Sequence, residues 1–237
     1  HAVAVVANAK AIVEHFAKCG APRQRFRLIP NILDTREFDE EARRGFPGKI
    51  AWEPTETIIK VARLDREKDH ETFLRAAARV SARRPTAQFL LAGDGAERAR
   101  LERLCQKLDL TGRVFFLGEV TEIPALLRTV AIGALTPSRN EGLSNTIMEY
   151  MAARLPIVAT DVGGNRELVD PPRGGFLVAP GDDSAIAEAL VRLLEDPLLR
   201  ADMGVHNRAR VEREFQPAII AGHFCSLYAD VLRGAGR

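Results

Sequence analysis

The segment from Pro137 to Ala152, PSRNEGLSNTIMEYMA, carries the residue types best suited to chemistry. It follows an apolar run, Gly142 favours a turn, and a helix is expected to begin near Ser144. The first N–H groups of a helix have no partner within it, so the backbone at Leu143, Ser144 and Asn145 can bind an anion such as a diphosphate. The helix dipole adds roughly 0.3–1 kcal/mol, so it assists such binding without dominating it.

Two carboxylates, Glu141 and Glu149, lie in this segment with seven residues between them. On the turn, Glu141 can accept hydrogen bonds from sugar hydroxyls, and Glu149 within the helix can accept those of a ribose. Each has a structural alternative. Ser138 and Glu141 fit an S-x-x-E capping box, which Gly142 makes less attractive because it would then lie inside the helix. Glu149 can equally be a solvated helix residue, so the pattern alone leaves both open.

Two cations follow a predicted strand in VARLDREKDHETF, residues 61–73. Arg63 and Lys68 on one loop can hold a diphosphate, since each hydrogen bond to a charged group contributes about 1.5–3 kcal/mol. The loop also carries several other charges, so a solvated loop explains the pattern equally well. Asp69 can cap the helix that follows.

The remaining candidate motifs are weaker. Gly93 and Gly95 follow a strand, but Arg98 occupies the third glycine position of a GxGxxG fingerprint, so a tight strand-to-helix turn is the preferred interpretation. In DVGGNRE, residues 161–167, two glycines permit either a strained backbone or close approach of a ligand. The five histidines and three cysteines show no metal-ligand spacing, and Ser138 and Ser144 lack a hydrolase elbow.

An alternation of apolar strands and amphipathic helices positions these residues. Strands are predicted at 3–7, 26–29, 56–62, 87–92, 113–117, 131–135, 156–160 and 175–178. Helices are predicted at 9–18, 70–83, 96–108, 122–129, 144–153, 165–169, 183–195 and 197–234, the last with a break near Pro217. Residues 34–55 are expected to be irregular. This rhythm predicts an α/β fold, a Rossmann-like parallel sheet with helices on both faces. Ligands of such sheets bind at the carboxyl ends of the strands, where the polar loops gather, and these loops indicate a phosphorylated ligand.

Composition limits the class of protein. Among 237 residues, 46% are hydrophobic and 28% charged, as in soluble globular proteins, and a net charge of +2 does not favour nucleic acid as a partner. No apolar run approaches the roughly 20 residues that span a bilayer, and no signal peptide is evident.

Three separated cysteines indicate a reducing, cytoplasmic compartment. Arg79, Arg83 and Arg84 suit either a membrane surface or, preferably, a solvated helix face. Because the first residues already form a predicted strand, a piece of a longer protein is expected.

Taken together, the motifs resemble the retaining glycosyltransferases of family 4, also called glycosyl transferases group 1. The matching pieces, in order, are RLDREK at 63–68, LLAGDG at 90–95, VFFLGEV at 114–120, PSRNEGLSNTIMEYMA at 137–152, LPIVATDVGGNRELV at 155–169 and GGFLVAPGD at 174–182. They extend over nearly the whole chain. The sequences of these motifs are most similar to those of members that build exopolysaccharide or other surface polysaccharides.

The resemblance implies the GT-B architecture, in which the active site lies between two Rossmann-like domains. Residues 1–33 would be a bridge from an absent N-terminal acceptor domain, residues 34–213 the nucleotide-sugar-binding domain, and residues 214–237 a helix that returns toward the N-terminal domain. Two local departures are visible: Ala62 replaces the usual glycine before Arg63, and Ile32 in NILD replaces the glycine of the usual NGVD.

The resemblance also assigns roles within the donor site. Arg63 and Lys68 would hold the donor diphosphate, Glu141 would be the catalytic residue at the donor sugar, and Glu149 would bind the ribose. The strand end around Phe116 would lie beside the base. Contacts to the sugar and phosphates would come from the backbone of Gly142, Leu143, Ser144 and Asn145. The donor would be a nucleoside-diphosphate sugar, preferably of UDP or GDP, and neither a metal nor a prosthetic group is expected.

The implied activity is transfer of a hexose-type sugar to a polysaccharide or lipid-linked glycan with retention of configuration, in the cytoplasm or at the inner face of the plasma membrane. The chain alone is expected to be inactive. Two alternatives stay open: a nucleotide-sugar epimerase of the same architecture, and a nucleotide-binding module that is inactive without its partner domain. A nicotinamide dehydrogenase is disfavoured by the broken GxGxxG fingerprint.

Overall fold

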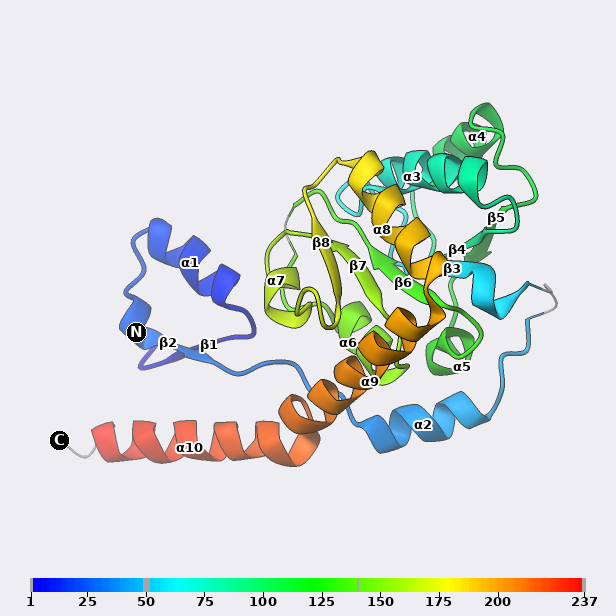
Figure 1. Cartoon of the computed structure of the whole chain (residues 1–237). Coiled ribbons are helices and arrows are strands. Elements are labelled where there is room, and N and C mark those ends of the chain that lie inside the picture. Colours follow the sequence, from blue (N-terminus) through cyan, green and yellow to red (C-terminus); the bar gives the residue numbers. More distant parts are fainter. Residues whose placement is uncertain (1, 49–51, 140, 236–237) are drawn as a thin grey trace.

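The main element is a parallel sheet whose strands lie in the order β5-β4-β3-β6-β7-β8 (Figure 1). A computed structural model describes residues 2–48, 52–139 and 141–235. The strands are β3 (Thr57–Val61), β4 (Gln88–Ala92), β5 (Val114–Gly118), β6 (Ile132–Leu135), β7 (Ile157–Thr160) and β8 (Gly175–Val178). Strand order reverses between β3 and β6, so this point is where an open α/β sheet binds its ligand. The predicted fold class is confirmed.

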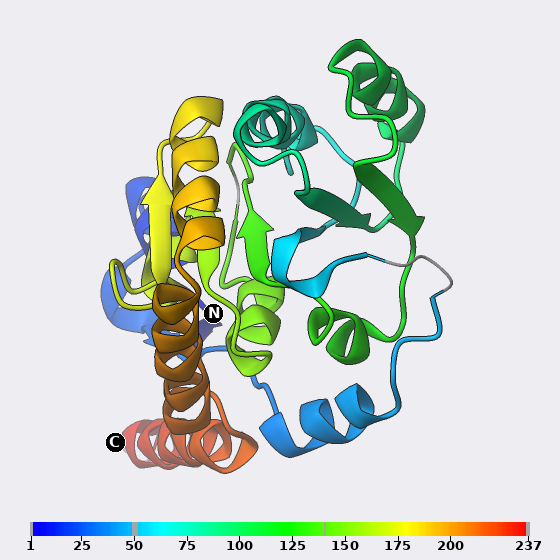
Figure 2. The same cartoon turned by 45° about the vertical axis from the view of Figure 1, so that its right-hand side comes forward.

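Helices cover both faces of this sheet. On one face, α3 (His70–Arg83), α4 (Arg98–Lys107) and α8 (Asp183–Glu195) bury a core with β3 and β4; on the other lie α2 (Thr35–Arg43), α5 (Ile123–Leu127), α6 (Asn145–Ala152) and α7 (Asn165–Leu168). The long helix α9 (Pro197–Glu214) packs beside α6 (Figure 2). Because both faces are covered, the strands are apolar almost throughout, as the sequence predicted.

A small N-terminal unit lies apart from the main sheet in Figure 1. Strands β1 (Val5–Ala7) and β2 (Phe26–Leu28) pair in parallel and flank α1 (Lys10–Lys18), and a short 3₁₀ turn (Arg23–Arg25) precedes β2. The unit packs against α10 (Pro217–Ala235) through a cluster of Ile29, Ile220 and Leu227. Among the described helices, none has the length and apolar character needed to span a bilayer.

The prediction that residues 34–55 are irregular was wrong, because α2 lies within them and a 3₁₀ turn (Pro54–Glu56) follows. The Asp34 carboxylate accepts the N–H of Arg36 at 2.8 Å and of Glu37 at 3.4 Å, which caps α2. Phe38 and Ala42, one turn apart, are buried, and α2 packs beside α5. The capping residue and this i, i+4 apolar pair were the available signals. Elsewhere the predicted break near Pro217 is confirmed between α9 and α10.

Candidate donor site at the strand reversal

The carboxyl edge of the sheet brings Lys68 and Glu141 into contact. Lys68 lies on the loop between β3 and α3, and Glu141 on the segment between β6 and α6, so they approach from either side of the strand reversal. The Lys68 Nζ lies 2.7 Å from Glu141 Oε2, and their side chains are only 23% and 11% exposed. Shielding from water strengthens this pair relative to a surface ion pair. Two residues that the sequence placed in one site therefore meet.

Arg63 occupies a different environment on the same loop. Its side chain is 82% exposed and forms an ion pair with Asp65 at 3.2 Å. The Asp65 carboxylate also accepts the N–H of Lys68 at 3.0 Å, which keeps the loop tight. Arg63 therefore lies near the Lys68–Glu141 contact but outside it. Asp69 accepts the N–H of Thr72 at 3.1 Å, so its predicted role as a helix cap is confirmed.

The N-terminus of α6 is capped by Ser144, whose Oγ accepts the N–H of Ile147 at 3.3 Å. The alternative capping box at Ser138 is therefore wrong: Ser138 instead donates its backbone N–H to the carbonyl of Glu67 at 2.9 Å. As predicted, the helix opens beside Glu141, with Gly142 and Leu143 in the preceding turn.

Asparagine side chains fix the linker after β2 to this helix start. Asn31 donates to the carbonyl of Leu143 at 3.0 Å and to the Asn145 side-chain oxygen at 2.7 Å, while Asn8 donates to the Asn31 side-chain oxygen at 3.0 Å. The N-terminal unit therefore contacts the same turn that carries Glu141.

Glycines allow the strand-end loops to interlock. Gly163 has a φ of +54°, and a Cβ there would lie 1.8 Å from the carbonyl oxygen of Glu141; one at Gly164 would lie 2.5 Å from that of Gly142. Of the two interpretations that the sequence left open, the strained backbone is confirmed at Gly163, and the close approach at both glycines is to the protein backbone. Gly93 and Gly95 make the same kind of contact to the carbonyls of Ala62 and Leu64, which confirms the tight-turn interpretation.

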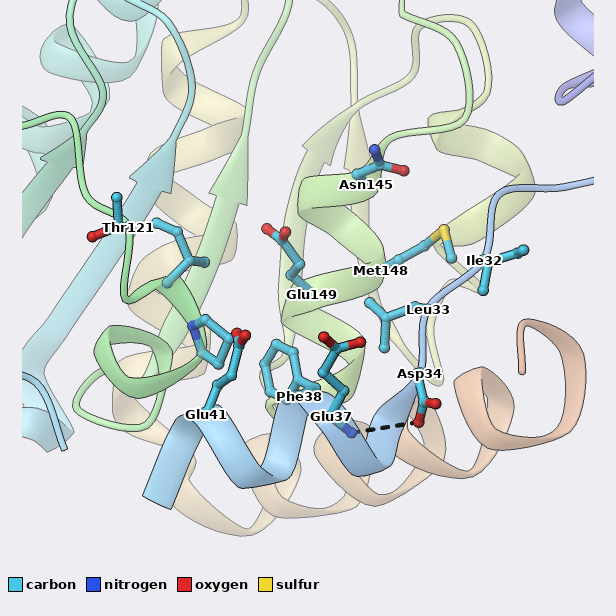
Figure 3. A pocket seen from close by; sticks show the side chains of 12 residues that line it. Ile32, Leu33, Asp34, Glu37, Phe38, Glu41, Thr121, Asn145, Met148 and Glu149 are labelled. Atoms are coloured by element: carbon cyan, nitrogen blue, oxygen red, sulfur yellow. Dashed lines mark hydrogen bonds between the residues drawn. The ribbon is translucent and has the colours of Figure 1, made fainter. Parts of the chain in front are cut away.

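Glu149 points into a recess of about 370 Å³ between α2, α6 and the segment after β5 (Figure 3). Burial raises the pKa of the Glu149 carboxyl to about 7, and within the described residues it has no hydrogen-bond or ion-pair partner. The solvated-helix alternative for Glu149 is therefore wrong. Glu37 and Glu41 of α2 face the same recess, as does Thr121. Sequence reasoning missed the two α2 carboxylates because it placed no helix there.

Phe116 lies in β5, and its side chain packs against the core face that α3 and α4 cover. The Arg98 guanidinium lies 5.9 Å from the centre of its ring. The phenyl ring is therefore partly buried against the core, and Gly118 is the last residue of β5. The side chains of Phe115 and Leu117 instead pack on the opposite face of the sheet.

A second recess of about 410 Å³ adjoins Glu141 on the side of the N-terminal unit. It is lined by Ala11, Ile12, His15, Phe16, Glu141, Gly142 and Gly163. Glu141 therefore lies between Lys68 on one side and a largely apolar recess on the other. Over residues 2–48, 52–139 and 141–235, no cluster of three or more His, Cys, Asp or Glu side chains could hold a metal ion.

Two exposed arginines of α3 and Arg84, which follows the helix, are paired with carboxylates. Arg79 contacts Asp183 and Arg83 contacts Glu188, both on α8, and Arg84 binds Glu56 at 2.5 Å. These pairs fit the interpretation of a solvated helix face.

Comparison with known proteins identifies the family to which this chain belongs. The family model described as Glycosyl transferases group 1 matches residues 45–210. An alpha-D-kanosaminyltransferase of Streptomyces kanamyceticus is 31% identical over 90% of this chain and 56% of its own length. A GDP-mannose-dependent monoacylated alpha-(1-6)-phosphatidylinositol monomannoside mannosyltransferase of Corynebacterium glutamicum is 33% identical over 80% of this chain and 52% of its own length.

Among solved structures, the Anabaena protein HepE in complex with UDP and glucose superposes with a TM-score of 0.83 at 23% identity, over 96% of this chain and 63% of that one. The chain thus spans only 52% to 63% of the length of these three relatives. More than half of its residues fall within the family match, and its α/β Rossmann-like fold is that of GT-B glycosyltransferases. The chain belongs to the glycosyl transferases group 1 family.

Proposed function

We propose that this chain is the donor-binding domain of a hexosyltransferase, which moves a sugar from a nucleoside-diphosphate donor to a polysaccharide or lipid-linked glycan with retention of configuration. The contact between Lys68 and Glu141 carries this proposal, because it places a cation and a carboxylate beside a helix N-terminus at the strand reversal. The relatives' names support the class of donor, since one is GDP-mannose-dependent and one structure holds UDP and glucose.

The diphosphate would bind between the Lys68 loop and the start of α6. Lys68 would leave Glu141 for the phosphates, Arg63 would swing in from solvent, and the N–H groups of Leu143, Ser144 and Asn145 would add neutral donors. These cations and amides would neutralise the leaving diphosphate without a metal. Release from Lys68 would turn the Glu141 carboxylate toward the donor sugar, with the backbone of Gly142 beside it.

Glu149 would accept hydrogen bonds from the ribose hydroxyls. Its recess reaches Thr121 in the segment after β5, so the base would lie along the backbone that follows Phe116. Backbone contacts of this kind suit either UDP or GDP.

In the proposed reaction, the bond between the sugar C1 and the phosphate oxygen breaks, and the acceptor oxygen bonds to C1 on the same face. The acceptor proton passes to the leaving phosphate, which guides the incoming hydroxyl. Glu141 would stabilise the positive charge that develops on the sugar, a case of electrostatic stabilisation of a transition state.

The division of the chain follows the same proposal. Residues 1–33 would bridge from an acceptor domain, residues 34–213 would bind the nucleotide sugar, and residues 214–237 would return toward the acceptor domain. Exposed apolar side chains of the N-terminal unit support this, since Val3 is 70% and Val6 43% exposed. We further propose that the chain binds its donor in the cytoplasm but completes transfer only with the acceptor domain.

Calorimetric binding of UDP, GDP, ADP and NAD to this chain tests the donor site. One nucleoside diphosphate should bind, and Lys68→Ala should weaken it tenfold or more, which corresponds to about 1.4 kcal/mol. Arg66→Ala is the matched control, because Arg66 lies on the same loop, is 86% exposed and pairs with Glu97 at 3.5 Å. Loss of affinity in both variants alike, or tight binding of NAD, would contradict the assignment.

The role of Glu141 needs the complete enzyme. Glu141→Gln should lower turnover far more than donor affinity, because the charge acts in the transition state. Product analysis in the same assay separates transfer from the epimerase alternative, which would release an epimerised nucleotide sugar and leave the acceptor unchanged. Unaltered turnover in Glu141→Gln would exclude this residue from catalysis.

A further inference from the structure

A lysine to which the proposed function assigns no role is buried beneath the candidate donor site. Lys60 lies in β3, its side chain is fully buried, and its Nζ lies 5.5 Å from the centre of the Phe73 ring. Burial lowers the pKa of the Lys60 ammonium to about 7, against the opposing influence of nearby carboxylates, chiefly Asp69. A buried ammonium is destabilising unless hydrogen bonds replace its hydration, so its partners show what it holds in place.

Those partners belong to two different loops. Lys60 Nζ donates to the carbonyls of Lys68 at 2.5 Å and Asp69 at 3.2 Å, and to the Thr136 hydroxyl at 2.6 Å. Three acceptors match the three N–H donors of an ammonium group. Asp69 has a φ of +47°, an unfavourable conformation that the hydrogen bond to its carbonyl helps to hold.

The ladder between β3 and β6 does not extend as far as these two loops. Strands β3 and β6 pair at Ile58 with Ile132 and at Ile59 with Gly133, and the pairing stops there. Beyond it, side chains bridge the two strands: Tyr150 Oη accepts the N–H of Val61 at 2.9 Å and donates to the carbonyl of Ala134 at 3.2 Å. Side chains therefore help to set the separation of the two strands beyond their last paired residues.

Lys60 is the most deeply buried of several links between the Lys68 loop and the Glu141 segment. Above it, Ser138 N–H donates to the Glu67 carbonyl at 2.9 Å, and Lys68 pairs with Glu141 at the surface. His70, also buried, supports the start of the same loop, with Nε2 3.0 Å from the Arg63 carbonyl.

We propose that Lys60 is a positioning residue of the donor site, which sets the separation between the loop of Lys68 and the segment of Glu141. This inference depends on the proposed function, because it states which geometry the diphosphate requires. A purely stabilising role would instead affect folding and leave the folded site unchanged.

Calorimetry on the full 237-residue chain distinguishes the two roles. The probe is whichever of UDP, GDP or ADP binds best, compared with its nucleoside monophosphate. Lys60→Met should weaken diphosphate binding about fivefold to twentyfold and monophosphate binding less than twofold. The reason is that the altered loop would misplace Lys68, which in the proposed site contacts the outer phosphate. Circular dichroism and a thermal melt establish that each variant is folded at the assay temperature.

Thr136 provides the matched pair of variants. Thr136→Val removes the hydroxyl that accepts from Lys60 at constant shape, so diphosphate binding should weaken about threefold, whereas Thr136→Ser retains the hydroxyl and should bind like the parent chain. Adding Thr136→Val to Lys60→Met should have little further effect, because both act through one contact.

The outcomes separate this inference from the proposed function. If the parent chain binds a diphosphate and Lys68→Ala loses it, but folded Lys60→Met and Thr136→Val bind within twofold of the parent, the positioning role is wrong and the donor site stands. Equal losses for diphosphate and monophosphate also overturn the positioning role. If the parent chain binds no diphosphate, or Lys68→Ala binds as well as the parent, the donor-site assignment fails and the inference fails with it.

Discussion

The strand-end edge of the main sheet and the N-terminal unit start from the same local pattern, an apolar strand followed by an amphipathic helix. In the main sheet, β3 and β7 have neighbours on both edges and helices on both faces, so Ile58 and Val158 are fully buried. In the N-terminal unit, two strands pair only with each other, and Val6 and Leu28 stay 43% and 44% exposed. The local pattern thus sets the element, whereas the number of neighbours sets its burial.

The same difference separates their turns. Gly163 and Gly20 both have positive φ, at +54° and +92°. A Cβ at Gly163 would meet the Glu141 carbonyl, whereas none of the described atoms lies within 4 Å of a Cβ at Gly20. The candidate site therefore lies where the strand-end loops interlock. The position of Glu141 depends on the packing of the Gly163 turn against it.

Gly163→Ala is expected to have the largest effect and sharpens this comparison. It should lower the free energy of unfolding by about 3 kcal/mol or more, because backbone strain of about 1–2 kcal/mol adds to the overlap with Glu141. Gly20→Ala should lower it by about 1 kcal/mol from strain alone. Urea denaturation of both variants measures the difference. Equal losses would show that the Glu141 turn yields as easily as an open loop.

Glu149→Gln tests whether the strand-end edge of the main sheet contains a buried carboxylate that destabilises the fold when it is ionised. The folded-state pKa of about 7 exceeds the usual 4.5, so the folded chain binds the proton more tightly than the unfolded chain. Stability from this group is complete below about pH 4.5 and lost as pH rises through 7. At pH 8 the variant should be more stable by about 2 kcal/mol, within the limit of about 1.4 kcal/mol per pKa unit.

Urea titrations of both proteins at pH 4.5 and pH 8 provide the measurement, and the difference should vanish at the lower pH. A stability difference independent of pH would mean that the carboxylate is not desolvated. Ribose recognition by Glu149 predicts that the same variant binds the nucleoside diphosphate more weakly, despite its greater stability.

Asp34→Ala tests the helix that joins the two regions. Loss of the cap of α2 should lower the free energy of unfolding by about 1 kcal/mol. Glu40→Ala on the exposed face of α2 is the control and should change it by less than about 0.5 kcal/mol. Thermal melts of the two variants compare them; if both behave alike, the cap is not what starts this helix.

Val5→Thr should have the smallest effect. Val5 is 37% exposed in this chain, so the change should alter the free energy of unfolding by less than about 0.5 kcal/mol. The matched change Val158→Thr, in buried β7, should cost about 1–3 kcal/mol because it buries a hydroxyl. In a complete enzyme whose acceptor domain covers β1, the cost of Val5→Thr should rise, and chemical denaturation of both forms would detect it.

Sequence patterns predicted the main domain closely. The bounds of α3 and α8 match the predicted 70–83 and 183–195, and each strand of the main sheet lies within one residue of its predicted range. Strands buried on both faces and helices with one apolar face carry strong periodic signals. The helix α2 was missed because it is short and mostly charged, with only Phe38 and Ala42 fully on the apolar side.

Prediction of the site was more uneven. Residue types and order indicated Lys68, Glu141 and the start of α6, because strand-end loops of a parallel sheet share one edge. The roles of Lys60 and Gly163 were not visible, since each depends on an atom from a distant segment. The face to which the Phe116 side chain points was likewise not visible, because it follows from strand packing.

The sequence by itself determined most of the strands and helices, the cap at Asp69, the start of a helix near Ser144, and which side chains could bind a phosphorylated ligand. Only the tertiary structure decided that Lys68 meets Glu141, 73 residues away in the chain, and that Lys60 and Glu149 are desolvated. Local periodicity reports burial along one element, whereas a contact across the strand reversal depends on strand order. Desolvation likewise depends on every segment that covers the group, so it is a property of the packed molecule.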